Sequence, residues 1–128
     1  MLCASDYADD EVELQGTQSP QGTQAPHSIA GTPQFMAPEV IRQTGHGAKA
    51  DIWSLGCTVI QMLTAAVPWN EISNRHAVFR HVGTGRVKPN YPPDVTQHCQ
   101  SFLDECFQLD PDCRPSAQQL LNHSFISP

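Results

Sequence analysis

The sequence predicts a mainly α-helical domain, and three observations lead to this fold class. The stretch 49–64 is apolar on nearly every face, and in the stretch 96–108 apolar residues recur at helical spacing. Proline and capping residues stand where the predicted helices begin. No stretch alternates apolar and polar side chains as a strand does, apart from the weak segment "GRVK" at 85–88.

The N-terminal 27 residues are expected to be disordered. They include the tandem hexads "QGTQSP" and "QGTQAP" at 15–26, which have no apolar period. A segment this polar buries too little surface to offset the entropy lost on ordering. We therefore divide the chain into a disordered acidic and QGTQ-repeat segment at 1–27 and a folded part at 28–128.

Pro38 is expected in the first turn of a short helix at 38–43, because that turn needs no backbone donor there. The stretch 49–64 is apolar on nearly every face and would run about 24 Å as a helix. A helix of this kind is usually buried. Pro68 should stop it, and Trp53 and Gly56 are expected to fill the core and to allow close packing.

Three further helices are predicted in the C-terminal half. A short one at 73–82 carries Ala77, Val78 and Val82. An amphipathic helix at 96–108 begins with Thr96 as its N-cap. Its core face comprises Cys99, Phe102, Leu103, Cys106 and Phe107. In the last helix Ser116 and Gln119 form a capping box, and Leu120 and Leu121 form the core face.

The charge of the chain is concentrated near its N-terminus. Residues 1–30 hold five acids and no Lys or Arg, and residues 31–128 hold eight acids and seven bases. These balances of −5 and −1 sum to the formal charge of −6. A nearly neutral body gives no reason to expect nucleic acid or an anionic membrane as a partner. The acidic run is most simply a solvated tail, with a docking motif as the alternative.

The five cysteines are odd in number and show no C-x-x-C spacing, which indicates reduced thiols in an intracellular protein. Cys99, Cys106 and Cys113 recur every seven residues beside His98, which leaves a zinc site as an alternative. A buried helix stripe accounts better for Cys99 and Cys106, so we expect no metal. No secretory signal and no apolar run of membrane-spanning length is found, so a cytoplasmic location is expected.

Three motifs in register identify a resemblance to a known family. They are "GTPQFMAPEV" at 31–40, "KADIWSLGCTVIQMLTAAVPW" at 49–69 and "DPDCRPSAQQLLNHSFI" at 110–126. Together they resemble the C-terminal part of a serine/threonine protein kinase domain, closest to the mitogen-activated protein kinase kinase kinase-like group. The resemblance covers residues 28–127 and implies the helical C-terminal lobe of the protein kinase-like fold, with the N-terminal lobe and the catalytic loop absent.

The resemblance assigns Ala-Pro-Glu at 37–39 to the end of the activation segment and implies that Glu39 pairs with Arg114 as a structural clamp. A planar guanidinium can hold a carboxylate through two parallel hydrogen bonds. The alternative is that the two are unrelated surface charges. Asp51 resembles the aspartate that anchors the catalytic loop, and favourable charge at a helix N-terminus is its simpler role.

Gly31, Thr32 and Pro33 resemble the loop that receives the substrate residue after the phosphoacceptor. In the family, the hydroxyl at Thr32 touches the catalytic aspartate and favours Ser/Thr over Tyr substrates, and a type I turn with Pro33 at its second position is compatible with this role. Ser28 is a candidate phosphosite, with Thr23 and Ser19 as alternatives. A phosphate would add about −1.5 to −2 charge.

The sequence lacks the parts that perform phosphoryl transfer in kinases. It contains no Gly-rich loop with its strand lysine, no His-Arg-Asp and no Asp-Phe-Gly. We therefore interpret the chain as part of an ATP-dependent Ser/Thr protein kinase of a signalling cascade. It is expected to be inactive in isolation, with no catalytic residue and no bound cofactor of its own. ATP and Mg are implied only for the complete domain.

The expected partners are a protein substrate, such as a downstream kinase, and the missing N-terminal half of the domain. The alternative function is a non-catalytic interaction module that binds substrates or other kinases. Since segments that would wrap the long helix are absent from the sequence, we also expect exposed apolar surface and a marginally stable or aggregating isolated chain.

Overall fold

The computed structural model describes residues 31–128. The predicted disorder at 1–27 and the candidate phosphosites Ser28, Thr23 and Ser19 lie outside this range. Within it, helices and short 3-10 turns follow one another and no strand occurs, which confirms the mainly α fold class. The elements are η1 (Pro33–Phe35), α1 (Pro38–Arg42), α2 (Ala48–Thr64), α3 (Arg75–Gly83), α4 (Gln97–Cys106), η2 (Pro111–Cys113) and α5 (Ala117–Leu121).

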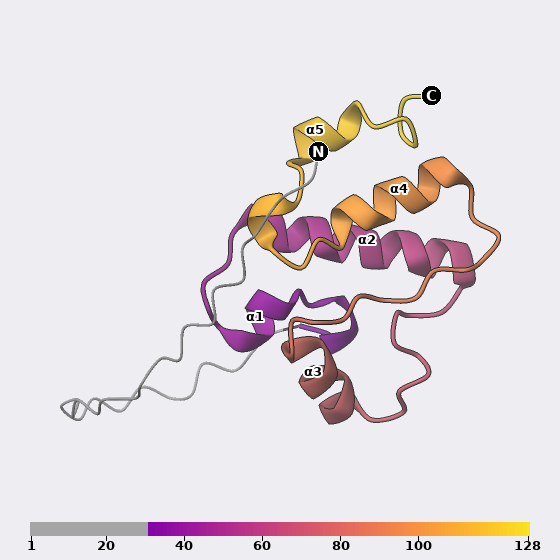
Figure 1. Ribbon diagram of the computed structural model, residues 1–128. Helices are drawn as coiled ribbons and strands as arrows, with labels where there is room; N and C mark the ends of the chain where they lie inside the picture. Colours follow the sequence, from indigo (N-terminus) through magenta and orange to yellow (C-terminus); the bar gives the residue numbers. More distant parts are fainter. Residues whose placement is uncertain (1–30) are drawn as a thin grey trace.

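The long helix α2 lies in the middle of the described part (Figure 1). Helix α4 packs along one side of α2, while α1 and α3 contact each other on the opposite side. The turn η1 contacts both α2 and α3, so it lies where these two helices meet. Helix α5 follows η2 near the end of the chain. This arrangement places residues 31–42 against the central helix and beside α3.

Helix α1 begins and ends for the reasons that the sequence indicated. Pro38 is its first residue, where the missing N–H leaves no helical bond unmade. Gln43 takes a left-handed conformation with a φ of 55° and closes the helix, since its N–H donates to the carbonyls of Glu39 and Val40. Pro38 and Glu39 are both buried, so this short helix packs into the body of the protein.

Helix α2 forms the core as predicted, but it is not buried on every face. Trp53 and Cys57 are fully buried, and the Trp53 ring meets the edge of Phe107 at a centroid distance of 5.0 Å. Leu55 and Met62, by contrast, are 39% and 72% exposed, which confirms the expected exposed apolar surface. The helix ends at Thr64 because Ala65 turns left-handed with a φ of 56°, before Pro68 is reached.

The close contact between α2 and α4 depends on Gly56. A Cβ atom at this position would lie 2.8 Å from Cζ of Phe107 and 2.9 Å from Cβ of Cys106. Such contacts are shorter than side chains tolerate, so only glycine lets the two helices approach this closely. This confirms the packing role expected for Gly56.

The two C-terminal helices begin at their predicted caps. Thr96 accepts a hydrogen bond from the N–H of Cys99 and starts α4. Ser116 and Gln119 exchange the two bonds of a capping box and start α5. Leu120 is buried, but Leu121 is 63% exposed, so the predicted two-residue core face of α5 is wrong at Leu121. Consecutive helix residues point about 100° apart, and only the side of α5 that carries Leu120 packs against the core.

Candidate functional site

The predicted substrate-binding turn lies on the surface with its central hydroxyl exposed. Gly31 has a φ of +132°, a conformation that favours glycine. Thr32 precedes η1, and its carbonyl accepts the N–H of Phe35 at 3.0 Å, which closes a turn with Pro33 at the second position. The Thr32 side chain is exposed and makes no capping bond. Its hydroxyl is therefore not used by the turn itself.

A hydrogen bond at the C-terminal end of the turn holds it against the central helix α2. Ser54 of α2 donates its hydroxyl to the carbonyl of Phe35 at 2.8 Å. Pro33 is buried, and η1 contacts both α2 and α3. The exposed Thr32 thus stands on a segment whose neighbouring residues are packed and hydrogen-bonded.

Glu39 and Arg114 are brought together across 75 positions of the chain. Arg114 donates from Nη1 to Oε1 of Glu39 at 2.5 Å and from Nη2 to Oε2 at 3.0 Å. Only 3% of Glu39 and 1% of Arg114 is exposed. The alternative of two unrelated surface charges therefore does not describe this pair. The parallel, buried geometry is that of a bidentate ion pair.

Arg114 has further partners that the sequence did not indicate. Its Nε donates to the carbonyl of Gln108 at 2.8 Å, and Nη1 donates to the carbonyl of Lys49 at 3.0 Å. Lys49 in turn donates from Nζ to the carbonyl of Arg114. The guanidinium also stacks over the Trp53 ring at 5.1 Å. Since these bonds go to backbone carbonyls, no residue type in the sequence could have signalled them.

Asp51 lies in the first turn of α2 with an exposed side chain. Within residues 31–128 its carboxylate has neither a hydrogen bond nor an ion pair. The structure therefore shows that this carboxylate is accessible on the exposed stripe of α2. Its role as an anchor for a catalytic loop stays a prediction.

One cysteine departs from the expectation that all thiols are reduced. Cys57, Cys99 and Cys106 are buried free thiols. Cys113 is disulfide-bonded, so the expectation of reduced thiols is wrong there. Spacing and an odd count do not reveal which thiols come within bonding distance, and this is the physical reason for the error. Among residues 31–128 no cluster of His, Cys, Asp or Glu could hold a metal ion.

Burial suppresses the reactivity of two of these thiols. Desolvation raises the pKa of Cys57 to about 12, with the neighbouring Cys106 adding to the effect. The pKa of Cys106 also rises to about 12, again chiefly through desolvation. Because the thiolate is the nucleophile, both residues are expected to resist iodoacetamide at pH 8 in the folded chain and to react in urea. Peptide mass spectrometry checks this, and equal labelling of Cys106 in both conditions would contradict it.

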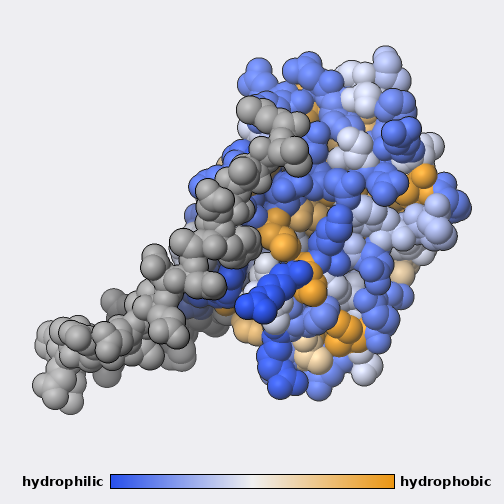
Figure 2. Space-filling view, viewed as in Figure 1, coloured by the Kyte–Doolittle hydropathy of each residue, from blue (hydrophilic) through white to orange (hydrophobic). Residues whose placement is uncertain are grey.

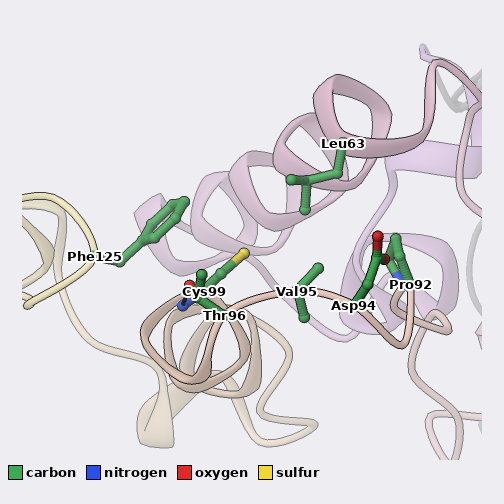
Figure 3. A pocket seen from close by; sticks show the side chains of 7 residues that line it. All are labelled: Leu63, Pro92, Asp94, Val95, Thr96, Cys99 and Phe125. Atoms are coloured by element: carbon green, nitrogen blue, oxygen red, sulfur yellow. Dashed lines mark hydrogen bonds between the residues drawn. The ribbon is translucent and has the colours of Figure 1, made fainter.

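A cavity lies away from the predicted turn, near the C-terminal end of α2 (Figure 3). Its volume is about 250 Å³. The residues that line it come from α2, from the loop before α4, from α4 and from the C-terminal segment: Leu63, Pro92, Asp94, Val95, Thr96, Cys99 and Phe125. None of the predicted site residues lines it. This cavity could not be predicted from the sequence, because its lining comes from segments far apart in the chain.

The comparison with protein families decides the identity of the fold. The sequence matches the family described as "Protein kinase domain" over residues 14–126, which is most of the chain. The chain belongs to the protein kinase domain family. The resemblance inferred from the three motifs is thereby confirmed, and the helices of this kinase chain are those of the C-terminal lobe.

Relatives of this kinase chain include mitogen-activated protein kinase kinase kinases. It is 50% identical over 99 residues to "Mitogen-activated protein kinase kinase kinase A" of Dictyostelium discoideum, covering 77% of this chain and 10% of the relative. It is 46% identical over 100 residues to "Mitogen-activated protein kinase kinase kinase 2" of Arabidopsis thaliana, covering 78% and 15%. The human "Mitogen-activated protein kinase kinase kinase 3" is 45% identical over 98 residues, with 77% and 15% covered.

The kinase chain thus spans between 10% and 15% of the length of these three relatives. Within residues 31–128, no helix is long and apolar enough to cross a membrane. The alignments with these relatives span 98 to 100 residues, and the family match begins at residue 14, before the resemblance predicted from residue 28.

Proposed function

We propose that this chain supplies the substrate-binding side of a serine/threonine protein kinase, with residues 28–128 as part of its C-terminal lobe. The observation that carries the proposal is the exposed Thr32 hydroxyl on a turn fixed to α2. The clamp between Glu39 and Arg114 holds the helix that follows. We expect an exposed hydroxyl on a fixed turn to hold a protein substrate beside its phosphoacceptor. Such positioning accounts for much of the rate in phosphoryl transfer.

The exposed face of α2 supports a second partner, the N-terminal half of the kinase domain. Asp51, Leu55, Thr58 and Met62 follow one another at helical spacing, and all four are exposed. Large apolar side chains on a helix in the middle of the molecule are typical of a surface that another segment covers. We propose that the N-terminal half packs here and that its catalytic loop meets Asp51.

Residues 31–128 do not fit a site for ATP and Mg. They hold no group of carboxylates, cysteines or histidines able to bind a metal ion, and the 128 residues contain none of the phosphate-binding motifs of kinases. We therefore derive no chemical step for this chain. What its own residues do is bind and orient a protein substrate, and the isolated chain is expected to be inactive.

Complementation tests the proposal. We expect a fusion of the N-terminal half of the kinase domain of the human relative to this chain to phosphorylate Ser/Thr in a protein kinase substrate, while the chain alone does not. Thr32→Val in the fusion should lower the rate about tenfold, as expected for the loss of one well-placed hydrogen bond. Radiolabelled phosphate transfer measures both effects.

Thr44→Val is the matched control, because Thr44 is also an exposed threonine of the same region but lies beyond α1. It should leave the rate unchanged. A folded but inactive fusion that still binds the substrate would favour the alternative, a non-catalytic interaction module. A rise in the melting temperature of the isolated chain with Mg-ATP would contradict our account of the missing site.

A further inference from the structure

Four arginines are exposed and lack an ionic partner within residues 31–128: Arg42, Arg75, Arg80 and Arg86. The three other basic residues of this range are in use. Lys88 pairs with Asp104 at 2.9 Å, Arg114 pairs with Glu39, and Lys49 donates to a backbone carbonyl. All positive charge that is left unpaired thus belongs to α1, α3 and the loop after α3. We call these four residues the arginine surface.

The helix dipole favours Arg42 and Arg80, which stand in the last turns of α1 and α3, but it does not explain Arg75. Arg75 is the first residue of α3, where the helix dipole disfavours a cation, and the first turn holds no acid to offset it. Arg42 lies with its guanidinium against Gly85, the residue before Arg86. Two cationic residues are therefore held near each other without an anion between them in the described residues. Such an arrangement favours the binding of an anion from outside.

The arginine surface adjoins the predicted substrate-binding turn. Helix α3 contacts both α1 and η1, and Thr32 stands at the start of η1. The acids of α4, Asp104 and Glu105, lie on the other side of α2 (Figure 1). Figure 2 shows strongly hydrophilic side chains beside apolar ones on the surface over α3. The unpaired arginines of the described part thus lie on α1, α3 and the loop after α3, and α3 contacts the turn at Thr32.

We propose that the arginine surface binds an acidic segment of the protein substrate, on the side of the substrate turn formed by α1 and α3. The proposal rests on the function proposed above. A protein segment fits better than nucleic acid, because the chain has a net charge of −6 and only these four arginines are unpaired in its described part. A substrate seated at Thr32 could reach α3 without crossing another helix, since η1 and α3 are in contact.

Binding of a charged peptide to the full chain tests this directly. The probe is a dye-labelled Glu-Gly repeat peptide, compared with its Gln-Gly counterpart by fluorescence anisotropy at low and moderate salt. We expect the acidic peptide alone to bind, and salt to weaken it. Arg80→Gln or Arg86→Gln should each weaken binding about threefold, and both together about tenfold, as for exposed ion pairs that add independently.

Lys88→Gln is the matched control, since it removes one exposed positive charge outside the arginine surface. It should leave the affinity unchanged. An equal loss in the Lys88 and Arg80 variants, or equal binding of the two peptides, would overturn the proposal. Binding that occurs only after the five acids of residues 6–13 are neutralised would also overturn it, because the chain itself would then occupy the surface.

This experiment needs no phosphate transfer, so its outcome is separate from that of the complementation assay. A chain that binds the acidic peptide but yields no active fusion would refute the proposed kinase function and keep the docking surface. An active fusion with no preference for the acidic peptide would support the proposed kinase function and refute the arginine surface as a docking site.

Discussion

Replacement of Arg114 by alanine is expected to destabilise the folded chain by about 3–5 kcal/mol. The reason is the carboxylate that remains. Glu39 is only 3% exposed and receives two hydrogen bonds from the guanidinium, so the variant would bury an uncompensated charge. The carbonyls of Lys49 and Gln108 would also lose their donor. Urea unfolding of the full chain, followed by tryptophan fluorescence, measures the change.

Two control variants distinguish the effect of losing the ion pair from the effect of shortening an arginine side chain. Arg80→Ala removes an exposed arginine from α3 and should change the free energy of unfolding by less than about 0.5 kcal/mol. The double variant Glu39→Gln with Arg114→Met leaves no buried charge and should recover part of the loss. If Arg114→Ala and Arg80→Ala unfold at the same urea concentration, the clamp is not a structural element of this chain.

Replacement of Trp53 by alanine is expected to cost about 3–5 kcal/mol, the usual loss for a fully buried tryptophan. Trp53 has no exposed surface, its ring meets Phe107, and the Arg114 guanidinium lies over it. The variant would thus open a cavity and remove the apolar wall beside the clamp. Urea unfolding followed by far-ultraviolet circular dichroism measures it, since this variant removes one of the two fluorescent tryptophans.

Met62→Ala is the control on the same helix. Met62 is 72% exposed, so its truncation should change the free energy of unfolding by less than about 0.5 kcal/mol. Because Trp53 contacts Arg114, the losses for Trp53→Ala and Arg114→Ala should not add in the double variant. Equal losses at Trp53 and Met62 would show that α2 does not form the core of the isolated chain.

The helices could be predicted from the sequence because their signals are local. Thr96 and Ser116 mark the first turns of α4 and α5, and Pro38 marks that of α1. Each signal acts through backbone groups within a few residues. The end of α2 was less predictable, since Ala65 adopts a left-handed conformation that alanine does not favour by itself. Packing of the following segment decides that boundary.

The site was predictable only where it coincides with a family motif. The motifs led to Glu39 and Arg114, but not to the backbone carbonyls that share the guanidinium. Exposed apolar surface was expected, but the residues that form it could not be named in advance. Leu55 and Leu121 belong to helical patterns that predict burial, and the structure leaves them on the surface. Burial depends on which other segments pack nearby, and no periodicity within one helix contains that information.

The position of Arg114 also has a consequence for biosynthesis. Glu39 is made 75 residues before its partner, and the Lys49 carbonyl 65 residues before. While the ribosome is still translating the intervening helices, the carboxylate has no guanidinium to meet and must stay hydrated. The packed form of α1 is therefore closed only after residue 114 has left the exit tunnel. Nascent chains that stall earlier should remain open to proteases and chaperones at this segment.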